Sequence, residues 1–311
     1  MAEEDPFEVF SSSLRSLFDH VVPANGDPLE LFDYSPPAQS NQPTLTCRIP
    51  PQQVNSLFAH HVWNASLILA DRISTSSIAG LEMGSTTKED NKEEEGAMSV
   101  CELGCGAGIP GLIAARSPKV RRVVISDYDD PLLIENLREN IQLGYEKDPN
   151  PREKLLAIGH TWGEEDTLSK ILDANNNERY THILLADTLW LTEAQHALIS
   201  SVTQLLALTP SARICFVAGF HSGRNAVRSF LRKAEATGLE KKEVDGKIWE
   251  ELAVGGERRR WGWDLEGEEG EDKEWMEEKE SNSERGKWVV VGEMGWSREK
   301  LEEVERGELA R

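Results

Sequence analysis

The chain has 311 residues, with 34 Lys or Arg against 55 Asp or Glu, which gives a formal net charge of −21 at pH 7. This acidic balance excludes a general basic nucleic-acid-binding protein. The length allows a well-buried core, and the hydrophobic fraction of 39% rises to about 47% when the 24 glycines are added, which is usual for a globular chain. There is no apolar run of about 18 residues and no basic leader, so we expect a soluble, cytoplasmic protein without a membrane partner.

Polar and charged stretches divide the chain into three expected regions. Residues 1–45 form a partly irregular N-terminal extension, residues 46–296 form one folded domain, and residues 297–311 form a charged C-terminal tail. Two acidic stretches inside the domain, near 84–96 and 264–285, lack apolar periodicity and concentrate like charges. We predict that both are disordered loops.

The first predicted element of the domain is an amphipathic helix. Apolar residues from Phe58 to Ile73 recur in steps of four and three, with Trp63 and Asn64 near one edge of the stripe. After the first acidic stretch, the apolar run at 98–103 predicts a buried strand that enters a glycine turn.

Strands and helices then alternate along the chain. Pro110 suits the first turn of one helix, and the Asp130–Pro131 pair opens the next. Thr192 and Gln195 have the spacing of a capping box in front of a further helix. This alternation predicts an α/β fold with a mostly parallel sheet that helices cover on both faces. The predicted strands cover residues 98–103, 120–126, 155–159, 180–186 and 213–219.

The last part of the domain breaks this alternation. Residues 247–254 and 287–291 have the composition of strands, and no helical pattern separates them. We therefore predict an antiparallel hairpin at the edge of the sheet. The second acidic stretch would lie at the tip of this hairpin, where a long insertion adds little closure entropy.

The most informative segment is the glycine turn at residues 102–108, with the sequence E-L-G-C-G-A-G. Glycines let a nucleotide-type ligand approach bare backbone at the end of a strand. A dinucleotide fingerprint needs a further glycine at position 109, which is Ile109, so an NAD-dependent oxidoreductase is disfavoured. Asp127 ends the next strand, 23 residues after Gly104, where a carboxylate can accept both ribose hydroxyls of an adenosine.

Several motifs together resemble the seven-strand, lysine-methyltransferase-like family of class I S-adenosylmethionine-dependent methyltransferases. The likeness covers roughly residues 55–295 and is strongest to fungal members labelled nicotinamide N-methyltransferase or elongation-factor N-terminal and lysine methyltransferase. Its motifs are Trp63-Asn64-Ala65, E-L-G-C-G-A-G-I-P at 102–110, Asp127-Tyr128, Glu135-Asn136-Leu137 with Asn140, Trp162-Gly163, and Ala186-Asp187-Thr188-Leu189-Trp190.

The resemblance implies a Rossmann-like methyltransferase domain at residues 46–296, with a mostly parallel seven-stranded sheet and an antiparallel C-terminal hairpin. It implies S-adenosyl-L-methionine as cofactor. The cofactor-binding residues that it implies are Trp63, Glu102, Gly104, Cys105, Gly106, Ala107, Gly108, Asp127, Tyr128, Trp162 and Ala186. Among these, Trp63 is implied to lie beside the methionine end, Asp127 to hold the ribose, and Trp162 to flank the adenine.

The acceptor is the open question at this stage. We predict that Asp187 orients an acceptor amine and that Trp190 forms a wall of its pocket, where relatives often carry tyrosine or phenylalanine. A protein lysine or N-terminal amine, for example of a translation elongation factor, is favoured over nicotinamide, whose neutral pyridine nitrogen needs no base. A non-catalytic module that binds the cofactor and uses its acidic loop is the alternative from another class.

Plainer interpretations stay open for the same residues. Trp63 and Trp162 also fit core or turn packing, and Asp187 also fits a turn cap after a strand. The seven histidines and four cysteines lack the spacing of a metal site or a disulfide framework. We expect a monomer with no metal and no nucleic-acid partner.

Overall fold

The structure of the chain is a computed structural model. It describes residues 24–52, 58–83, 98–220, 222–242, 249–252, 257–260 and 286–307. The acidic stretches predicted to be loops, near 84–96 and 264–285, lie entirely outside the described residues.

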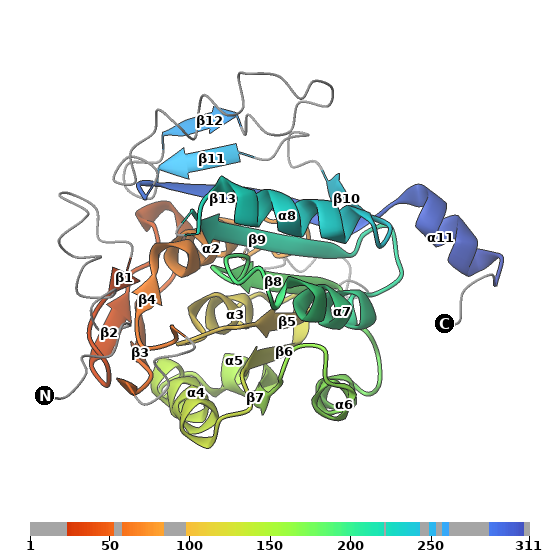
Figure 1. Cartoon of the computed structure of the whole chain (residues 1–311). Helices are drawn as coiled ribbons and strands as arrows, with labels where there is room; N and C mark the ends of the chain where they lie inside the picture. The colour runs from red at the N-terminus through yellow and green to blue at the C-terminus, as the bar shows by residue number, and fades with distance from the viewer. Residues whose placement is uncertain are drawn as a thin grey trace, which may run out of the picture.

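One sheet runs through the centre of the molecule (Figure 1). Its strands are β5 (Met98–Leu103), β6 (Val120–Asp127), β7 (Leu155–Gly159), β8 (His182–Ala186), β9 (Arg213–Gly219), β10 (Leu239–Lys242), β11 (Trp249–Leu252), β12 (Arg258–Arg260) and β13 (Trp288–Trp296). Within the described residues their order is β12-β11-β13-β9-β8-β5-β6-β7, and β10 also pairs with β13. Strands β5 to β9 are parallel, so the predicted α/β class with a mostly parallel sheet is confirmed.

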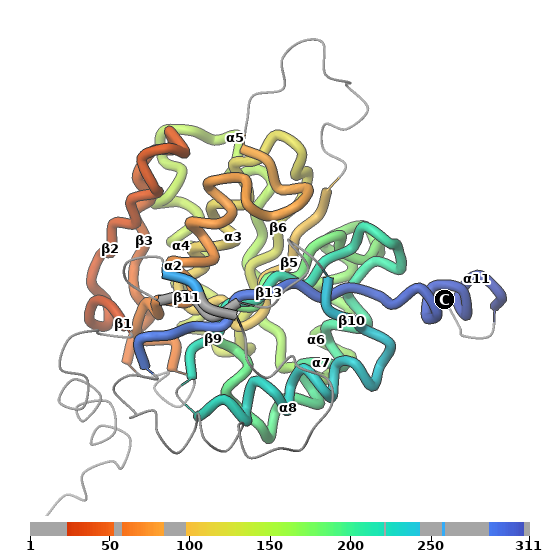
Figure 2. The backbone as a smooth tube through the Cα atoms, turned by 90° about the horizontal axis from the view of Figure 1, so that it is seen from above, coloured from red at the N-terminus to blue at the C-terminus, as the bar shows by residue number. Residues whose placement is uncertain are grey.

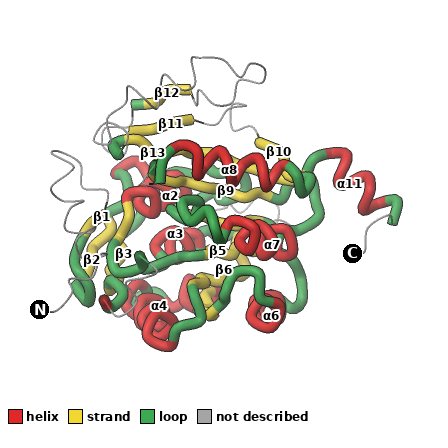
Figure 3. Tube along the Cα trace, viewed as in Figure 1, coloured by secondary structure: helices red, strands yellow, loops and turns green. Residues whose placement is uncertain are grey.

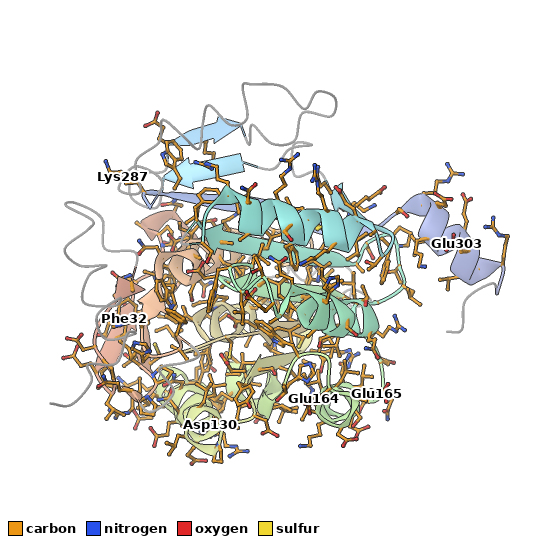
Figure 4. The ribbon with its side chains drawn as sticks, viewed as in Figure 1. Phe32, Asp130, Glu164, Glu165, Lys287 and Glu303 are labelled. Atoms are coloured by element: carbon orange, nitrogen blue, oxygen red, sulfur yellow. The ribbon has the colours of Figure 1, made fainter. Side chains whose placement is uncertain are left out.

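Helices cover both faces of this sheet (Figure 2). They are α2 (Asn64–Ser74), α3 (Ile109–Ala114), α4 (Pro131–Gly144), α5 (Pro149–Lys154), α6 (Glu165–Ala174), α7 (Gln195–Leu205), α8 (Arg224–Glu235) and α11 (Arg298–Glu305). Helices α2, α3 and α4 share one hydrophobic core with the sheet, and α6, α7 and α8 share another. Helix α11 extends from the body, and Figure 4 shows its Glu303 well away from the sheet. Among the described helices, none has the length and apolar character needed to cross a bilayer.

The pleat of the strands explains why there are two cores. Successive side chains of a strand point to opposite faces. In β5, Val100 belongs to the core under α2, α3 and α4, whereas Cys101 and Leu103 belong to the core under α6, α7 and α8. A strand buried on both faces reads as a continuous apolar run. The predicted bounds 98–103, 155–159 and 213–219 are therefore confirmed residue for residue.

The antiparallel C-terminal hairpin is confirmed, with a difference in extent. Strand β13 pairs antiparallel with β11 through its first half and with β10 through its second half. It also pairs antiparallel with β9 along Val289–Met294. The last strand of the chain thus lies between strands formed earlier, and β12 adds an outer edge that the sequence pattern did not indicate.

Two helix starts differ from prediction. Helix α2 begins only at Asn64, because Val62 and Trp63 form strand β4, which pairs with β1 (Ala24–Asn25). The predicted capping box before α7 is wrong: the side chain of Gln195 is fully buried and donates to the carbonyls of Leu189 and Ala226, at 2.8 Å each. At the starts of both α2 and α7, contacts with distant residues override the structure that the local sequence pattern predicts.

The N-terminal part adds a hairpin of β2 (Leu31–Tyr34) and β3 (Leu45–Arg48), seen at the edge of the molecule in Figure 3, with a 3₁₀ turn at Ala38–Ser40 between them. The expected domain boundary at residue 45 falls inside this hairpin. Asn140 of α4 ties the hairpin to the glycine turn. Its Oδ1 accepts from the Arg48 amide at 2.6 Å, and its Nδ2 donates to the carbonyls of Arg48 at 2.9 Å and Ala107 at 3.0 Å.

Replacing Asn140 by alanine should lower the free energy of unfolding by about 2–4 kcal/mol, because it leaves buried backbone groups of β3 and of the glycine turn without partners. Urea denaturation measures this loss. The control is Glu135→Ala on the same helix, which removes only an exposed pair with Arg138 and should change stability by less than about 0.5 kcal/mol. Similar losses in the two variants would contradict the bridging role of Asn140.

Candidate functional site

A cavity of about 290 Å³ opens at the carboxyl ends of β5, β6 and β8. The strand order reverses between β5 and β8, which is where open α/β sheets bind their ligands. No lysine or arginine is found among the described residues that line the cavity. Most of the site residues predicted from the sequence line it: Trp63, Gly104, Cys105, Gly106, Ala107, Asp127, Tyr128, Trp162, Ala186, Asp187 and Trp190.

The glycines of the turn are required by backbone conformation, and the space around each of them differs. Gly104, Gly106 and Gly108 all have positive φ, at 66°, 55° and 80°. A Cβ on Gly104 would lie 2.7 Å from Cγ2 of Thr188 and 2.9 Å from Cζ2 of Trp162, so side chains of the cavity wall close on it. Gly106 has open space where a Cβ would be, apart from one carbonyl at 3.9 Å. The turn therefore exposes bare backbone to the cavity at Gly106.

Asp127 links the glycine turn to the two strands beside it. Its Oδ2 accepts from the Gly106 amide at 2.7 Å, and its Oδ1 accepts from the Tyr128 amide at 2.8 Å. Its carbonyl accepts from the His160 amide at 2.8 Å. Burial raises the pKa of Asp127 to about 6, against the opposing effect of these amides. The carboxylate is therefore ionised at neutral pH and keeps lone pairs for a ligand.

Glu102 and Gly108, two of the predicted residues, do not line the cavity. Glu102 is fully buried beneath the turn, where its Oε2 accepts from the Gly111 amide of α3 at 2.7 Å. Burial, with the nearby Asp127 adding to it, raises the pKa of Glu102 to about 8, so this carboxyl is mostly protonated at neutral pH. Gly108 immediately precedes α3 and packs near Ile125. Both residues shape the turn from below.

An aromatic cluster of Phe58, Trp63 and Trp190 forms part of the cavity wall. The ring of Phe58 lies 4.6 Å from that of Trp190, edge to face, and 6.2 Å from that of Trp63. The indole N–H of Trp63 donates to the Phe58 carbonyl at 2.9 Å. Phe58 lines the cavity but was not predicted to do so, because its spacing fitted the apolar stripe of a helix. Its positive φ of 56° places it in a turn instead.

Asp187 follows β8 in a left-handed backbone conformation, with φ of 57°. Its amide donates to the Val217 carbonyl and its Oδ1 accepts from the Gly219 amide, both at 2.8 Å. Non-glycine residues rarely adopt this conformation, and it persists where the surroundings fix it. Two bonds to β9 thus hold the carboxylate of Asp187 at the cavity.

The remaining lining residues differ in exposure. Tyr128 is 47% exposed, whereas Cys105 is buried and burial raises the pKa of its thiol, which keeps it neutral. His160 also lines the cavity, but the sequence offered no signal for it beyond its place two residues before Trp162. Ala197 of α7 also lines the cavity and was not predicted, since the residue type alanine indicates no chemical role.

Comparison with known proteins identifies the family. A family model described as lysine methyltransferase matches residues 41–237. The protein N-terminal and lysine N-methyltransferase efm7 of Schizosaccharomyces pombe is 30% identical over 160 residues, which are 51% of this chain and 54% of that protein. Proteins of the same name match from Cryptococcus neoformans, at 28% identity over 48% of this chain and 44% of theirs, and from Yarrowia lipolytica, at 28% over 58% and 64%.

The chain thus spans about half the length of the first of these curated relatives. Among solved structures, the methyltransferase domain of bacterial CtHen1-C aligns with a TM-score of 0.43 and 10% identity, over 75% of this chain and 99% of that domain. The family model covers well over half of the chain. The chain therefore belongs to the lysine methyltransferase family, whose cofactor is S-adenosylmethionine.

Proposed function

We propose that the chain is an S-adenosylmethionine-dependent N-methyltransferase that acts on a protein amine, either a lysine side chain or an N-terminus. The observation that carries the proposal is the composition of the cavity wall. Bare backbone at Gly106, the carboxylates of Asp127 and Asp187, and several aromatic rings line the same cavity. The names of the fungal relatives support a protein amine as the acceptor.

The residues of the cavity fit this cofactor. A dinucleotide would need positive charge or a helix terminus for its phosphates, whereas S-adenosylmethionine has no phosphate and carries a positive sulfonium. Among the described lining residues there is no lysine or arginine, and Asp127, Asp187 and the aromatic faces suit that charge. Asp127 would hold the ribose, Trp162 would flank the adenine, and Trp63 would lie by the methionine end.

When bound, the cofactor supplies an electrophilic methyl group that an unprotonated amine takes by in-line displacement. The chain's own residues have three tasks in this reaction. Phe58, Trp63 and Trp190 exclude water and shape a narrow path for the acceptor. Asp187, fixed by its bonds to β9, orients the amine by accepting a hydrogen bond from it.

Asp127→Asn should weaken binding of S-adenosylhomocysteine about 5- to 150-fold, the equivalent of the roughly 1–3 kcal/mol lost with a charge-assisted hydrogen bond. The asparagine oxygen can still accept from the Gly106 amide. In the unmodified chain, affinity should be full about one pH unit above 6 and fall below pH 6 toward the affinity of Asp127→Asn, as the carboxylate gains a proton. Isothermal titration calorimetry between pH 5 and 7.5 measures both effects.

The control for this measurement is Asp129→Asn, which changes a nearby carboxylate that does not line the cavity. Its affinity and pH profile should match the unmodified chain. A steep pH profile that persists in Asp127→Asn would show that another group holds the ribose.

Asp187→Asn should lower kcat about 10- to 100-fold and change the Kd for S-adenosylhomocysteine by less than about threefold. The asparagine keeps an acceptor for the Gly219 amide but loses the charge that orients the amine. Glu193→Gln, at an exposed position nearby, serves as the matched control and should retain full kcat. Equal loss of cofactor affinity and kcat in Asp187→Asn would argue for a structural role.

Radiolabelled S-adenosylmethionine and a fungal protein extract test the acceptor class. We expect the label in protein, at lysine or at an N-terminus, and mass spectrometry then identifies the substrate; a translation elongation factor is the one that the sequence resemblance implies. Label in nicotinamide alone would reverse the choice of acceptor. Tight cofactor binding with no transfer to either pool would favour a non-catalytic module.

A further inference from the structure

The turn between β7 and α6 is held by a chain of side-chain hydrogen bonds that the proposed mechanism does not use. His160 begins this turn and is 1% exposed. Its Nδ1 lies 2.7 Å from Oγ1 of Thr167 on α6, and its Nε2 lies 2.8 Å from Oγ of Ser201 on α7. The Gly163 amide donates to the same Ser201 oxygen at 2.9 Å. One imidazole therefore joins two helices and a loop.

The neighbouring carbonyl groups favour one direction of donation along this chain. The hydroxyl of Thr167 donates to the Glu164 carbonyl at 3.2 Å, so its oxygen accepts from Nδ1–H of His160. A neutral imidazole then accepts at Nε2, and Ser201 supplies the proton. The Ser201 hydroxyl thus donates a hydrogen bond to His160, and its oxygen accepts one from the Gly163 amide. Burial lowers the pKa of His160 to about 4, which agrees with a neutral ring.

The end of this turn packs closely against helix α7. Gly163 has φ of 84°, and a Cβ placed there would lie 3.1 Å from Cβ of Ala197. Ala197 and Ser201 are four residues apart, so they lie on the same face of α7. The first supplies a small apolar surface and the second a hydrogen-bond acceptor. The position of Gly163 on α7 is thus fixed by both packing and a hydrogen bond.

The same turn contributes Trp162 to the cavity wall and contacts the end of β6, where Asp127 contributes another part of the wall. The His160 amide donates to the Asp127 carbonyl, which anchors the end of β6. Trp162, one residue before Gly163, lies so close to the glycine turn that a Cβ on Gly104 would reach its Cζ2 at 2.9 Å. Figure 4 shows Glu164 and Glu165 at the start of α6, where this turn ends. A shift of the turn would move Trp162 relative to Asp127.

We propose that His160 and Ser201 are positioning residues that set the affinity of the cavity for the adenosine part of its ligand, by holding Trp162 at a fixed distance from Asp127. The inference rests on the proposed function, because it takes the space between Trp162 and Asp127 as the adenosine site. It goes beyond that function in assigning affinity to Ser201, which does not line the cavity, and to the two ring hydrogen bonds of His160. Their effect is transmitted through Gly163 to Trp162.

A double-mutant cycle tests this transmission, with S-adenosylhomocysteine as the probe and calorimetry as the readout. Ser201→Ala should weaken binding about tenfold, and the matched control Ser200→Ala on the same helix should stay within about twofold. In a Trp162→Ala background, Ser201→Ala should cause no further loss beyond about twofold, because the two changes act on one element. Equal losses in both backgrounds would overturn the proposal, as would unchanged binding in Ser201→Ala.

Two variants of His160 keep the test valid if Ser201→Ala does not fold. In His160→Gln the amide oxygen reaches about as far as Nε2 and can accept from Ser201, whereas the shorter His160→Asn serves only the Thr167 side. Binding should stay within about threefold of the unmodified chain for glutamine and fall about tenfold for asparagine. Equal affinities in the two variants would overturn the role proposed for the hydrogen bond between His160 and Ser201.

Nitrogen NMR of the His160 ring in the unmodified chain tests the chain of donors without reference to function. We expect a proton on Nδ1 and none on Nε2 at neutral pH. A proton on Nε2 would overturn the proposed direction of donation. If the unmodified chain binds no S-adenosylhomocysteine, the proposed function fails, and the ring tautomer still decides whether the hydrogen-bond chain exists.

Discussion

The hydrogen bond from the Gly106 amide to the carboxylate of Asp127 is the constraint on which the cavity depends. At 2.7 Å it joins the turn after β5 to the end of β6, and its acceptor is charged, which makes it one of the stronger bonds in the chain. Glu102 lies nearby beneath the turn, but its carboxyl is mostly protonated at neutral pH. Of the two carboxyl groups next to the glycine turn, Asp127, which lines the cavity, therefore carries the negative charge.

The parts of the fold that were predictable are those in which burial alone decides the structure. Strands β5 and β9 have the predicted bounds because they are buried on both faces, and a continuous apolar run suffices to recognise them. Strand β7 also has the predicted bounds, although it is a partly exposed edge strand. Trp63 and Gln195 were misassigned because pairing with β1 and buried hydrogen bonds override local periodicity. Strand β10 exists because β13 is long enough to pair with it, which no local pattern records.

In the candidate site, too, some residues could be predicted from the local sequence and others could not. The glycine turn and Asp127 could be recognised because their chemistry depends on residue type and on spacing along the chain. Phe58 and His160 could not, since each enters the cavity through contacts with distant residues. Glu102 marks the opposite case: the motif that contains it was recognised, but its side chain serves the start of α3 and lies below the cavity. Motif membership alone does not determine which way a side chain faces.

The position of β13 has a consequence for biosynthesis. This strand is synthesised last, yet it fills the place beside β9, which leaves the ribosome some seventy residues earlier. At roughly 5–20 residues per second, the backbone edge of β9 waits for several seconds without its partner. An apolar strand with a free edge is a template for pairing with other chains. The nascent protein is therefore exposed to such pairing until β13 is available, and a chain truncated before residue 288 would keep that open edge permanently.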